Sequence, residues 1–210
     1  MPAPRKFSRE QLRLAALALV DEHGLAALTM RSLAAELGTG AMTIYNYVDG
    51  RDGLEALLVE AVQATVAPIE PSADWRADLR ASAEANWRAV RAHPDVIPLI
   101  LTRRVDDPAT MVTGEVMLDA IARGGRSGQD LLIAFRTVTG FVMGCAQAEL
   151  AGPLSIATGE DAADITARAR ALPADRFPRL IEIAGAAAAS TPEEEFRAGL
   201  DVIMAGLEHT

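Results

Sequence analysis

The stretch that decides the fold is LTMRSLAAELGTGAMTIYNYV, residues 28–48, which reads as two short helices joined by a glycine-containing turn. Thr29 can cap the first helix, apolar residues then recur at helical spacing, and Gly38 ends it. Residues 41–48 contain no proline or glycine and predict a second short helix. Two helices in this arrangement form a helix-turn-helix, in which the second helix enters the DNA major groove. Because any helical protein contains several such turns, the pattern alone is a weak indication of DNA binding.

A longer helix is predicted on each side of this pair. The sequence Ser8-Arg9-Glu10-Gln11 resembles a capping box, and apolar residues follow at positions i, i+3, i+4, i+7 and i+8 until Gly24 ends the helix. After the turn at Asp49-Gly50, apolar residues repeat along one helical face toward Pro68. The segment Pro68-Ile69-Glu70-Pro71 is linker-like, so we predict one domain at residues 1–67 and a second at residues 68–210.

The rest of the chain also predicts helices, separated by proline and glycine. Alanine is abundant, and β-branched and aromatic residues form no alternating runs. Thr191-Pro192-Glu193-Glu194 places a capping hydroxyl, a proline at the first helical position and acids in the first turn. The predicted helices cover residues 74–92, 95–103, 109–123, 128–151, 161–172, 174–189 and 192–208. The fold class is therefore all-α, with an N-terminal three-helix helix-turn-helix domain followed by a larger C-terminal helical domain.

The composition excludes several classes of protein. Half of the 210 residues are hydrophobic and 23% are charged, so the chain can bury a substantial core. Cys145 is the single cysteine and the three histidines lie far apart in the sequence, which excludes an internal disulfide and gives no pattern for a metal site. We therefore expect no metal and no cofactor, and a reducing, cytoplasmic location.

One segment, residues 131–148, resembles a membrane span. It carries a single charge, Arg136, in 18 residues and contains the helix-packing pattern Gly140-x-x-x-Gly144. The charge, together with polar residues at the end of the segment, suits a helix buried inside an oligomer better than a membrane anchor. Residues 1–7 are not followed by the apolar stretch of a secretory signal, so we expect no membrane association.

The segments at residues 28–38, 42–48 and 51–54 together resemble the DNA-binding region of TetR-family transcriptional regulators, and the resemblance covers about residues 7–66. Family members typically have a threonine opening the second helix, an Ala-x-x-Leu-Gly end to that helix, and a Thr-Leu-Tyr-x-Tyr-Phe-like recognition helix. Gly40 and Gly50-Arg51 depart from the more usual polar residue and Ser-Lys pair. A looser resemblance to the tetracycline-repressor type of C-terminal domain continues through Trp87, His93-Pro94, Gly140, Gly144, Phe177-Pro178 and Phe196-x-x-Gly199-Leu200.

The resemblance implies a ligand-responsive repressor that binds a palindromic operator in double-stranded DNA as a homodimer and is released by a small, largely apolar effector. In the family, the first turn of the recognition helix reads base edges, which places Ala41–Thr43 on the bases and Asn46 one turn later. Arg31 can hold guanine through O6 and N7, whereas hydroxyl groups and Arg51 suit phosphate oxygens. The expected DNA contacts are Thr29, Arg31, Ala41, Met42, Thr43, Tyr45, Asn46, Tyr47 and Arg51.

These residues also have a packing interpretation. Tyr45 and Tyr47 could serve mainly as packing residues, and Arg31 could belong to a solvated helix face. Ile44 and Val48 are expected in the core.

The resemblance further implies that residues 131–150 and 192–208 form a four-helix interface in the homodimer. Residues 131–150 are apolar on nearly all sides, so one face can pack in its own domain while another meets the partner, with Gly140 and Gly144 permitting close approach. Large apolar and sparse polar residues are expected to line an effector pocket: Trp87, Met111, Met117, Phe135, Thr139, Met143, Gln147 and Phe177. The alternative for each of them is a plain core position.

Charge is distributed unevenly along the chain. The formal net charge is −9, but residues 1–52 carry six basic and six acidic side chains, so the deficit belongs to residues 53–210. Near the start, Arg5, Lys6, Arg9 and Arg13 oppose only Glu10, which predicts a positive N-terminal arm beside the DNA backbone.

Two other functions compete with the regulator hypothesis. The weak basicity of the first domain leaves open a helical small-molecule-binding or interaction protein without specific DNA binding. For an enzyme, the chain lacks Gly-x-Ser-x-Gly, His-Glu-x-x-His and a phosphate-binding loop after a strand, so we expect no catalytic residues.

Overall fold

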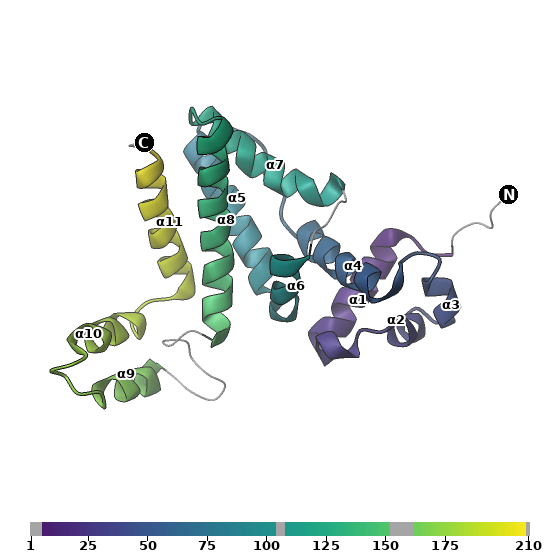
Figure 1. Cartoon of the computed structure of the whole chain (residues 1–210), viewed down its shortest axis with the longest axis horizontal. Coiled ribbons are helices and arrows are strands. Elements are labelled where there is room, and N and C mark those ends of the chain that lie inside the picture. The colour runs from purple at the N-terminus through teal and green to yellow at the C-terminus, as the bar shows by residue number, and fades with distance from the viewer. Residues whose placement is uncertain (1–5, 104–107, 152–161, 209–210) are drawn as a thin grey trace. The chain divides into compact units, whose positions relative to one another are not determined.

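A computed structural model describes residues 6–103, 108–151 and 162–208, and all regular secondary structure in these residues is helical (Figure 1). The all-α prediction is therefore confirmed for the described part of the chain. The chain forms two compact units, named here unit 1 (Met1–Gly124) and unit 2 (Gly125–Thr210).

Unit 1 contains the predicted helix-turn-helix together with the helices that follow it. Its helices are α1 (Arg9–His23), α2 (Met30–Glu36), α3 (Ala41–Ile44), α4 (Gly50–Ala64), α5 (Trp75–Arg91), α6 (Ile97–Thr102) and α7 (Pro108–Arg123), with 3-10 turns at Leu25–Ala27 and Pro94–Val96. The helices of unit 2 are α8 (Gly128–Ala151), α9 (Ala162–Arg170), α10 (Pro178–Ala187) and α11 (Pro192–Glu208).

The first helix begins and ends as the sequence predicts. The Ser8 hydroxyl accepts the Gln11 N–H at 3.1 Å, and the Gln11 side chain accepts the Ser8 N–H at 2.8 Å, which completes a capping box. Gly24, with φ of 77°, ends the helix in a conformation that other residues seldom adopt. The buried face of α1 packs on α4.

An ion pair ties α1 to α4. Arg9 Nε donates to Glu60 Oε2 at 2.7 Å, and its Nη2 donates to Oε1 of the same carboxylate at 2.5 Å. The Glu60 side chain is 3% exposed. Burial removes water from the Glu60 carboxylate, which costs free energy on folding. The two hydrogen bonds from the Arg9 guanidinium offset that cost.

The recognition helix is shorter than predicted, and this corrects the expected helix at residues 41–48. The α-helical part is Ala41–Ile44, and a turn continues the chain through Tyr47. Asn46 N–H donates to the Thr43 carbonyl and Tyr47 N–H to the Ile44 carbonyl, at 3.2 and 2.9 Å. These i→i−3 bonds tighten the backbone after the first turn, so a regular α-helix does not continue.

The helices α5 and α7 pack against each other and against α4 within unit 1. Asp78 on α5 joins them: its carboxylate accepts the Ser72 N–H at 2.8 Å and Arg123 Nη2 at 2.7 Å. The Ser72 backbone bond, followed by the bond from Arg123, holds the pKa of the Asp78 carboxyl below its usual value. The segment after residue 71 is thereby attached to the end of α7.

Unit 2 is built on α8 and α11, which lie side by side (Figure 1). The Phe141 and Phe196 rings meet with centroids 5.3 Å apart, and Phe196 and Leu200 are fully buried. The predicted start of α11 is confirmed, because Thr191 Oγ1 accepts the Glu194 N–H at 3.2 Å and Glu194 accepts the Thr191 N–H at 2.9 Å. These bonds from Thr191 lower the pKa of the Glu194 carboxyl.

The helix predicted at residues 174–189 starts later than expected. Residues 174–177 form a turn in which the N–H groups of Arg176 and Phe177 both donate to the Pro173 carbonyl, at 3.0 Å. Pro178 then occupies the first helical position of α10, where its missing N–H costs nothing. α10 packs on α9 through the buried residues Ala184 and Ala169.

The closest approach between α8 and α11 among the described glycines is at Gly199. We expect Gly199→Ala to destabilise unit 2 by about 1–3 kcal/mol. The added Cβ would lie 2.6 Å from Cζ of Phe141, whose ring packs on Phe196. Gly185→Ala on α10 is the matched control, because its Cβ would meet no atom within 4 Å. Urea unfolding compares the two variants, and a Gly199→Ala protein as stable as the control would contradict the assignment.

Candidate nucleic-acid interface

A buried apolar layer positions α2 and α3. Leu33 and Ala34 on α2 are buried, as are Ile44 at the end of α3 and Val48 after it. The prediction that Ile44 and Val48 belong to the core is confirmed. With these side chains directed inward, the opposite faces of the two short helices are left at the surface of unit 1.

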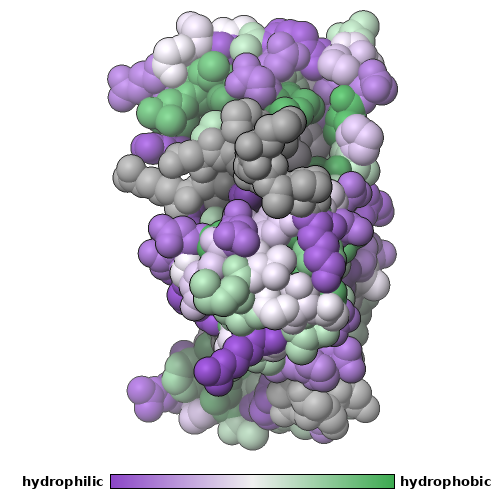
Figure 2. Space-filling view, turned by 90° about the vertical axis from the view of Figure 1, so that its right-hand side faces the viewer, coloured by the Kyte–Doolittle hydropathy of each residue, from purple (hydrophilic) through white to green (hydrophobic). Residues whose placement is uncertain are grey.

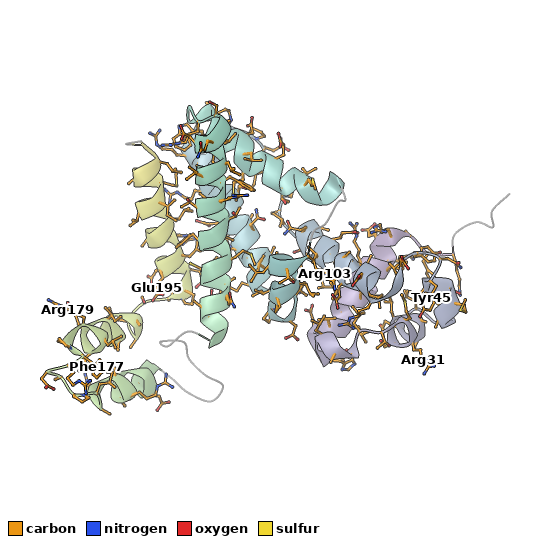
Figure 3. The ribbon with its side chains drawn as sticks, in the orientation of Figure 1. Arg31, Tyr45, Arg103, Phe177, Arg179 and Glu195 are labelled. Carbon is orange, nitrogen blue, oxygen red and sulfur yellow. The ribbon has the colours of Figure 1, made fainter. Side chains whose placement is uncertain are left out.

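The solvent-facing side of α2 and of the α3 segment carries most of the residues that are predicted to contact bases. Met42 is 76% exposed and Tyr45 is 53% exposed, whereas Ala41, Thr43 and Tyr47 are half-buried. Arg31 and Asn46 are exposed. Figure 3 shows Arg31 extending from α2 and Tyr45 on the α3 segment. In the middle of the face in Figure 2, which looks from the side of α3, residues of intermediate hydropathy lie among hydrophilic ones.

Several predicted phosphate contacts already make hydrogen bonds inside unit 1. Thr29 caps α2: its hydroxyl accepts the Ser32 N–H at 3.0 Å, and its own N–H donates to Ser32 Oγ at 2.8 Å. The Tyr47 hydroxyl accepts the Phe7 N–H at 2.8 Å. Thr43 Oγ1 accepts the Thr39 hydroxyl at 3.2 Å, which leaves the Thr43 proton as a donor.

Arg51, predicted to meet phosphate, is bonded to the backbone that precedes α2. Its Nη1 donates to the Leu28 carbonyl at 2.5 Å, and its Nε donates to Glu55 Oε1 at 2.6 Å. These bonds hold the beginning of α2 against the beginning of α4. A contact of Arg51 with DNA stays a prediction, and the geometry favours a structural role.

The Glu55 carboxylate also connects α4 to the end of α6, and the sequence pattern did not predict this link. Arg103, which is labelled in Figure 3, follows α6. It is paired with Glu55 and donates to Asp52 Oδ1 at 2.8 Å. The bond to Asp52 is the largest cause that raises the pKa of the Arg103 guanidinium. No local pattern joins residues separated by about fifty positions, so the sequence offered no signal for this network.

The residues predicted to line an effector pocket differ in their surroundings. Within unit 1, Trp87 and Met117 are buried at 1% and 2% exposure, whereas Met111 is 56% exposed. In unit 2, Gln147 is exposed and four residues are half-buried: Phe135, Thr139, Met143 and Phe177. The Thr139 hydroxyl donates to the carbonyl of Phe135 on its own helix at 2.9 Å. The role of all eight residues in binding an effector stays a prediction.

No metal ligand set accompanies this surface in the part of the chain that the structure describes. Groups of three or more histidine, cysteine or acidic side chains that could hold an ion do not occur there. Burial, followed by the charges of Glu149 and Glu195, raises the pKa of the Cys145 thiol, which disfavours its reactive thiolate form.

Family models match both parts of the chain. Residues 12–57 match the model described as bacterial regulatory proteins of the tetR family. Residues 67–210 match that of the tetracyclin repressor-like C-terminal domain. The second match alone spans more than half of the chain.

Individual relatives indicate the same family as the two family models. The chain is 36% identical over 141 residues to the HTH-type transcriptional repressor DrrR1 of Streptomyces coeruleorubidus, which aligns 65% of this chain but 51% of that protein. The chain thus spans about half the length of this relative. It is 29% identical over 206 residues to the tetracycline repressor protein class D of Escherichia coli, covering 97% of this chain and 90% of that protein.

A solved structure also matches over nearly the whole chain. The crystal structure of the Streptomyces coelicolor TetR family protein ActR in complex with (S)-DNPA superposes with a TM-score of 0.79 at 28% identity. The match covers 96% of both chains. From the helix-turn-helix, the two family models and this superposition together, we conclude that the chain belongs to the TetR family.

Proposed function

We propose that this protein is a ligand-responsive transcriptional repressor that binds a palindromic operator as a homodimer and is released by a small, largely apolar molecule. One observation carries the proposal: in a TetR-family chain, α2, α3 and the turn after α3 present Arg31, Met42 and Asn46 outward from a buried layer. In this proposal residues 1–67 bind DNA and residues 68–210 bind the effector and the second subunit.

The exposed residue types suit major-groove recognition. A guanidinium such as that of Arg31 can bond guanine O6 and N7 together, and the Asn46 amide can bond adenine N6 and N7. Ala41 and Met42 offer apolar contact to a thymine methyl group, and hydroxyl groups such as that of Thr43 suit phosphate or base edges. With few charged groups, the surface is expected to read its operator through a small number of hydrogen bonds.

Arg31→Ala is expected to weaken operator binding by about 5- to 150-fold for each half-site, because one bidentate contact to guanine is worth about 1–3 kcal/mol. Fluorescence anisotropy with a labelled operator duplex measures the change. Arg88→Ala is the control, because Arg88 is a guanidinium on α5 paired with Glu84 rather than a residue of the α2–α3 surface. Equal affinity of the Arg31→Ala protein and the wild type would remove Arg31 from the interface.

The homodimer is proposed to form through α8 and α11. Ile133, Thr137, Gly140 and Gly144 recur along the exposed side of α8, and Val202 on α11 is 74% exposed. A Cβ added at Gly140 or Gly144 would meet no atom within 4 Å, so a helix of a second copy has room to approach there. Two-fold symmetry would then separate the two recognition surfaces by about 34–36 Å, one turn of DNA.

The same interface explains the apolar character of α8. Among the described residues, the helix segment Gly128–Glu149 has the length and hydropathy of a membrane span, and 22% of its most apolar window is buried. Large exposed apolar surfaces mark sites of association. We assign this surface to the second subunit rather than to a bilayer, and we place the protein in the cytoplasm as a regulator without catalytic activity.

The superposed relative, ActR, supports the proposal that this chain binds an effector. ActR is described in complexes with (S)-DNPA and with actinorhodin. For this chain we propose a small, largely apolar molecule, because the predicted lining is mainly methionine and aromatic side chains with few polar groups.

Selection of bound duplexes from a random DNA pool by the 210-residue chain tests the proposal. The expected product is one enriched sequence with two-fold symmetry, bound saturably and with strong dependence on salt. If no sequence is enriched and binding stays non-specific at low salt, the repressor assignment is wrong and a helical binding protein without DNA recognition takes its place. Light scattering of the same preparation should give the mass of a dimer.

A further inference from the structure

The segment that precedes α1 lies against the turn that follows α3. Phe7 N–H donates to the Tyr47 hydroxyl at 2.8 Å, which joins positions forty residues apart in the chain. The two aromatic rings also meet, with centroids 6.4 Å apart and planes tilted by 58°. Tyr47 therefore holds the chain before α1 by both its hydroxyl and its ring.

This docking places the ammonium of Lys6 next to the recognition segment. Lys6 Nζ lies 3.5 Å from Thr39 Oγ1, which in turn donates to Thr43 Oγ1 at 3.2 Å. The same ammonium lies 5.1 Å from the centroid of the Phe7 ring. Both groups are neutral and the Lys6 side chain is exposed, so these contacts position the positive charge without cancelling it.

Two nearby arginines differ from Lys6 in this respect. Arg9 is bonded to both carboxylate oxygens of Glu60, and Arg51 is bonded to Glu55. Their charges are compensated inside unit 1, and a phosphate would have to compete with a carboxylate for each. Arg5, the remaining neighbour of Lys6 in the predicted positive arm, lies outside the described residues. The structure thus gives Lys6, a cation of the predicted arm, a defined position beside α3.

We infer that Lys6 neutralises one DNA phosphate in each half-site, and that Tyr47 is the positioning residue that holds residues 6–7 against α3 for this contact. The inference rests on the proposed function, and it adds a contact that the resemblance to the family did not supply. Each phosphate neutralised by a cation releases counterions, so the slope of log Kobs against log[salt] becomes steeper by about 0.9.

Lys6→Gln tests the charge. With the selected operator duplex and salt between about 50 and 200 mM, the variant should lose about 0.9 of slope for each bound subunit. At about 0.1 M salt this corresponds to roughly eight-fold weaker binding for each subunit. Lys6→Arg should retain the wild-type slope. Arg88→Gln, which removes one positive charge from α5, is the matched control and should also retain it.

Tyr47→Phe tests the positioning role, because it removes the acceptor of the Phe7 N–H and keeps the ring. A tyrosine that only donates its proton to phosphate is neutral, so its loss would lower affinity and leave the slope unchanged. If Tyr47 positions Lys6, Tyr47→Phe should reduce the salt slope by at least half as much as Lys6→Gln does. When it is added to Lys6→Gln, Tyr47→Phe should cause no further reduction in the slope.

The outcomes separate this inference from the proposed function. A wild-type chain that enriches no duplex overturns the repressor assignment itself. A wild type that binds its operator, with a Lys6→Gln protein of the same slope, overturns the phosphate contact alone. A Tyr47→Phe slope equal to that of the wild type overturns the positioning role. Circular dichroism and light scattering of each variant confirm that the helices and the mass of the assembly are retained.

Discussion

Val202→Glu is expected to convert the proposed dimer into a monomer and to abolish specific operator binding. Val202 is 74% exposed on α11, beside α8 in the same unit, on the surface assigned to the second subunit. Because the interface is two-fold, each substitution occurs twice, and each carboxylate loses its water without gaining a partner. A cost of several kcal/mol raises the dimer dissociation constant by about 10³-fold or more.

The effect on DNA follows from the geometry of half-sites. A monomer presents one recognition surface, so it gives up the contacts of the second half-site. Light scattering at micromolar concentration and anisotropy with the operator duplex measure the two effects. Val112→Glu places the same charge at a residue of α7 that is 58% exposed, and this control should remain dimeric. A Val202→Glu protein that is dimeric and binds its operator would place the interface elsewhere.

Trp87→Ala is expected to lower the free energy of unfolding by about 3–5 kcal/mol. The Trp87 side chain is 1% exposed on α5, and the Arg91 guanidinium lies 4.9 Å from the ring centroid. Truncation therefore removes a large buried surface and leaves a cavity that the neighbouring helices fill only in part. Since domains are stable by only about 5–15 kcal/mol, this loss removes a large fraction of the total stability.

Met111→Ala is the matched control for Trp87→Ala, because the resemblance assigned both residues to the same effector pocket. Met111 is 56% exposed, so its truncation should change the free energy of unfolding by no more than about 0.5 kcal/mol. Urea unfolding followed by circular dichroism measures both variants. Similar losses for the two would contradict the assignment of Trp87 to the core and of Met111 to the surface.

Features that depend on a few neighbouring residues were predictable. The capping boxes at Ser8 and Thr191 formed as expected, because each joins groups three residues apart in the chain. Gly24 ended α1 for a similarly local reason. The burial of Ile44 and Val48 followed from apolar spacing and from the resemblance of the recognition segment. Local sequence is therefore sufficient to locate the helix-turn-helix and the face that it exposes.

Features that depend on distant residues were not predictable. The pair of Arg103 with Glu55 and the bond from Arg51 to the Leu28 carbonyl join segments that are far apart in the sequence. The second of these bonds makes Arg51, a predicted phosphate ligand, a support for α2. The close contact within unit 2, between Gly199 and Phe141, likewise joins two different helices. Helical periodicity specifies which face of a helix is apolar and leaves open which other helix it meets.

The amino-acid sequence by itself determined the helices, their caps and the recognition segment of a TetR-family chain, because hydrogen bonds and apolar periodicity within a few turns decide these features. The tertiary structure decided which of the polar groups remain available to a ligand. Arg9 and Arg51 bond to buried carboxylates, whereas Lys6 is carried to the recognition segment by Tyr47. Folding determines these partners because a charge is compensated by whatever group packing brings within a few ångströms, however distant that group is in the chain.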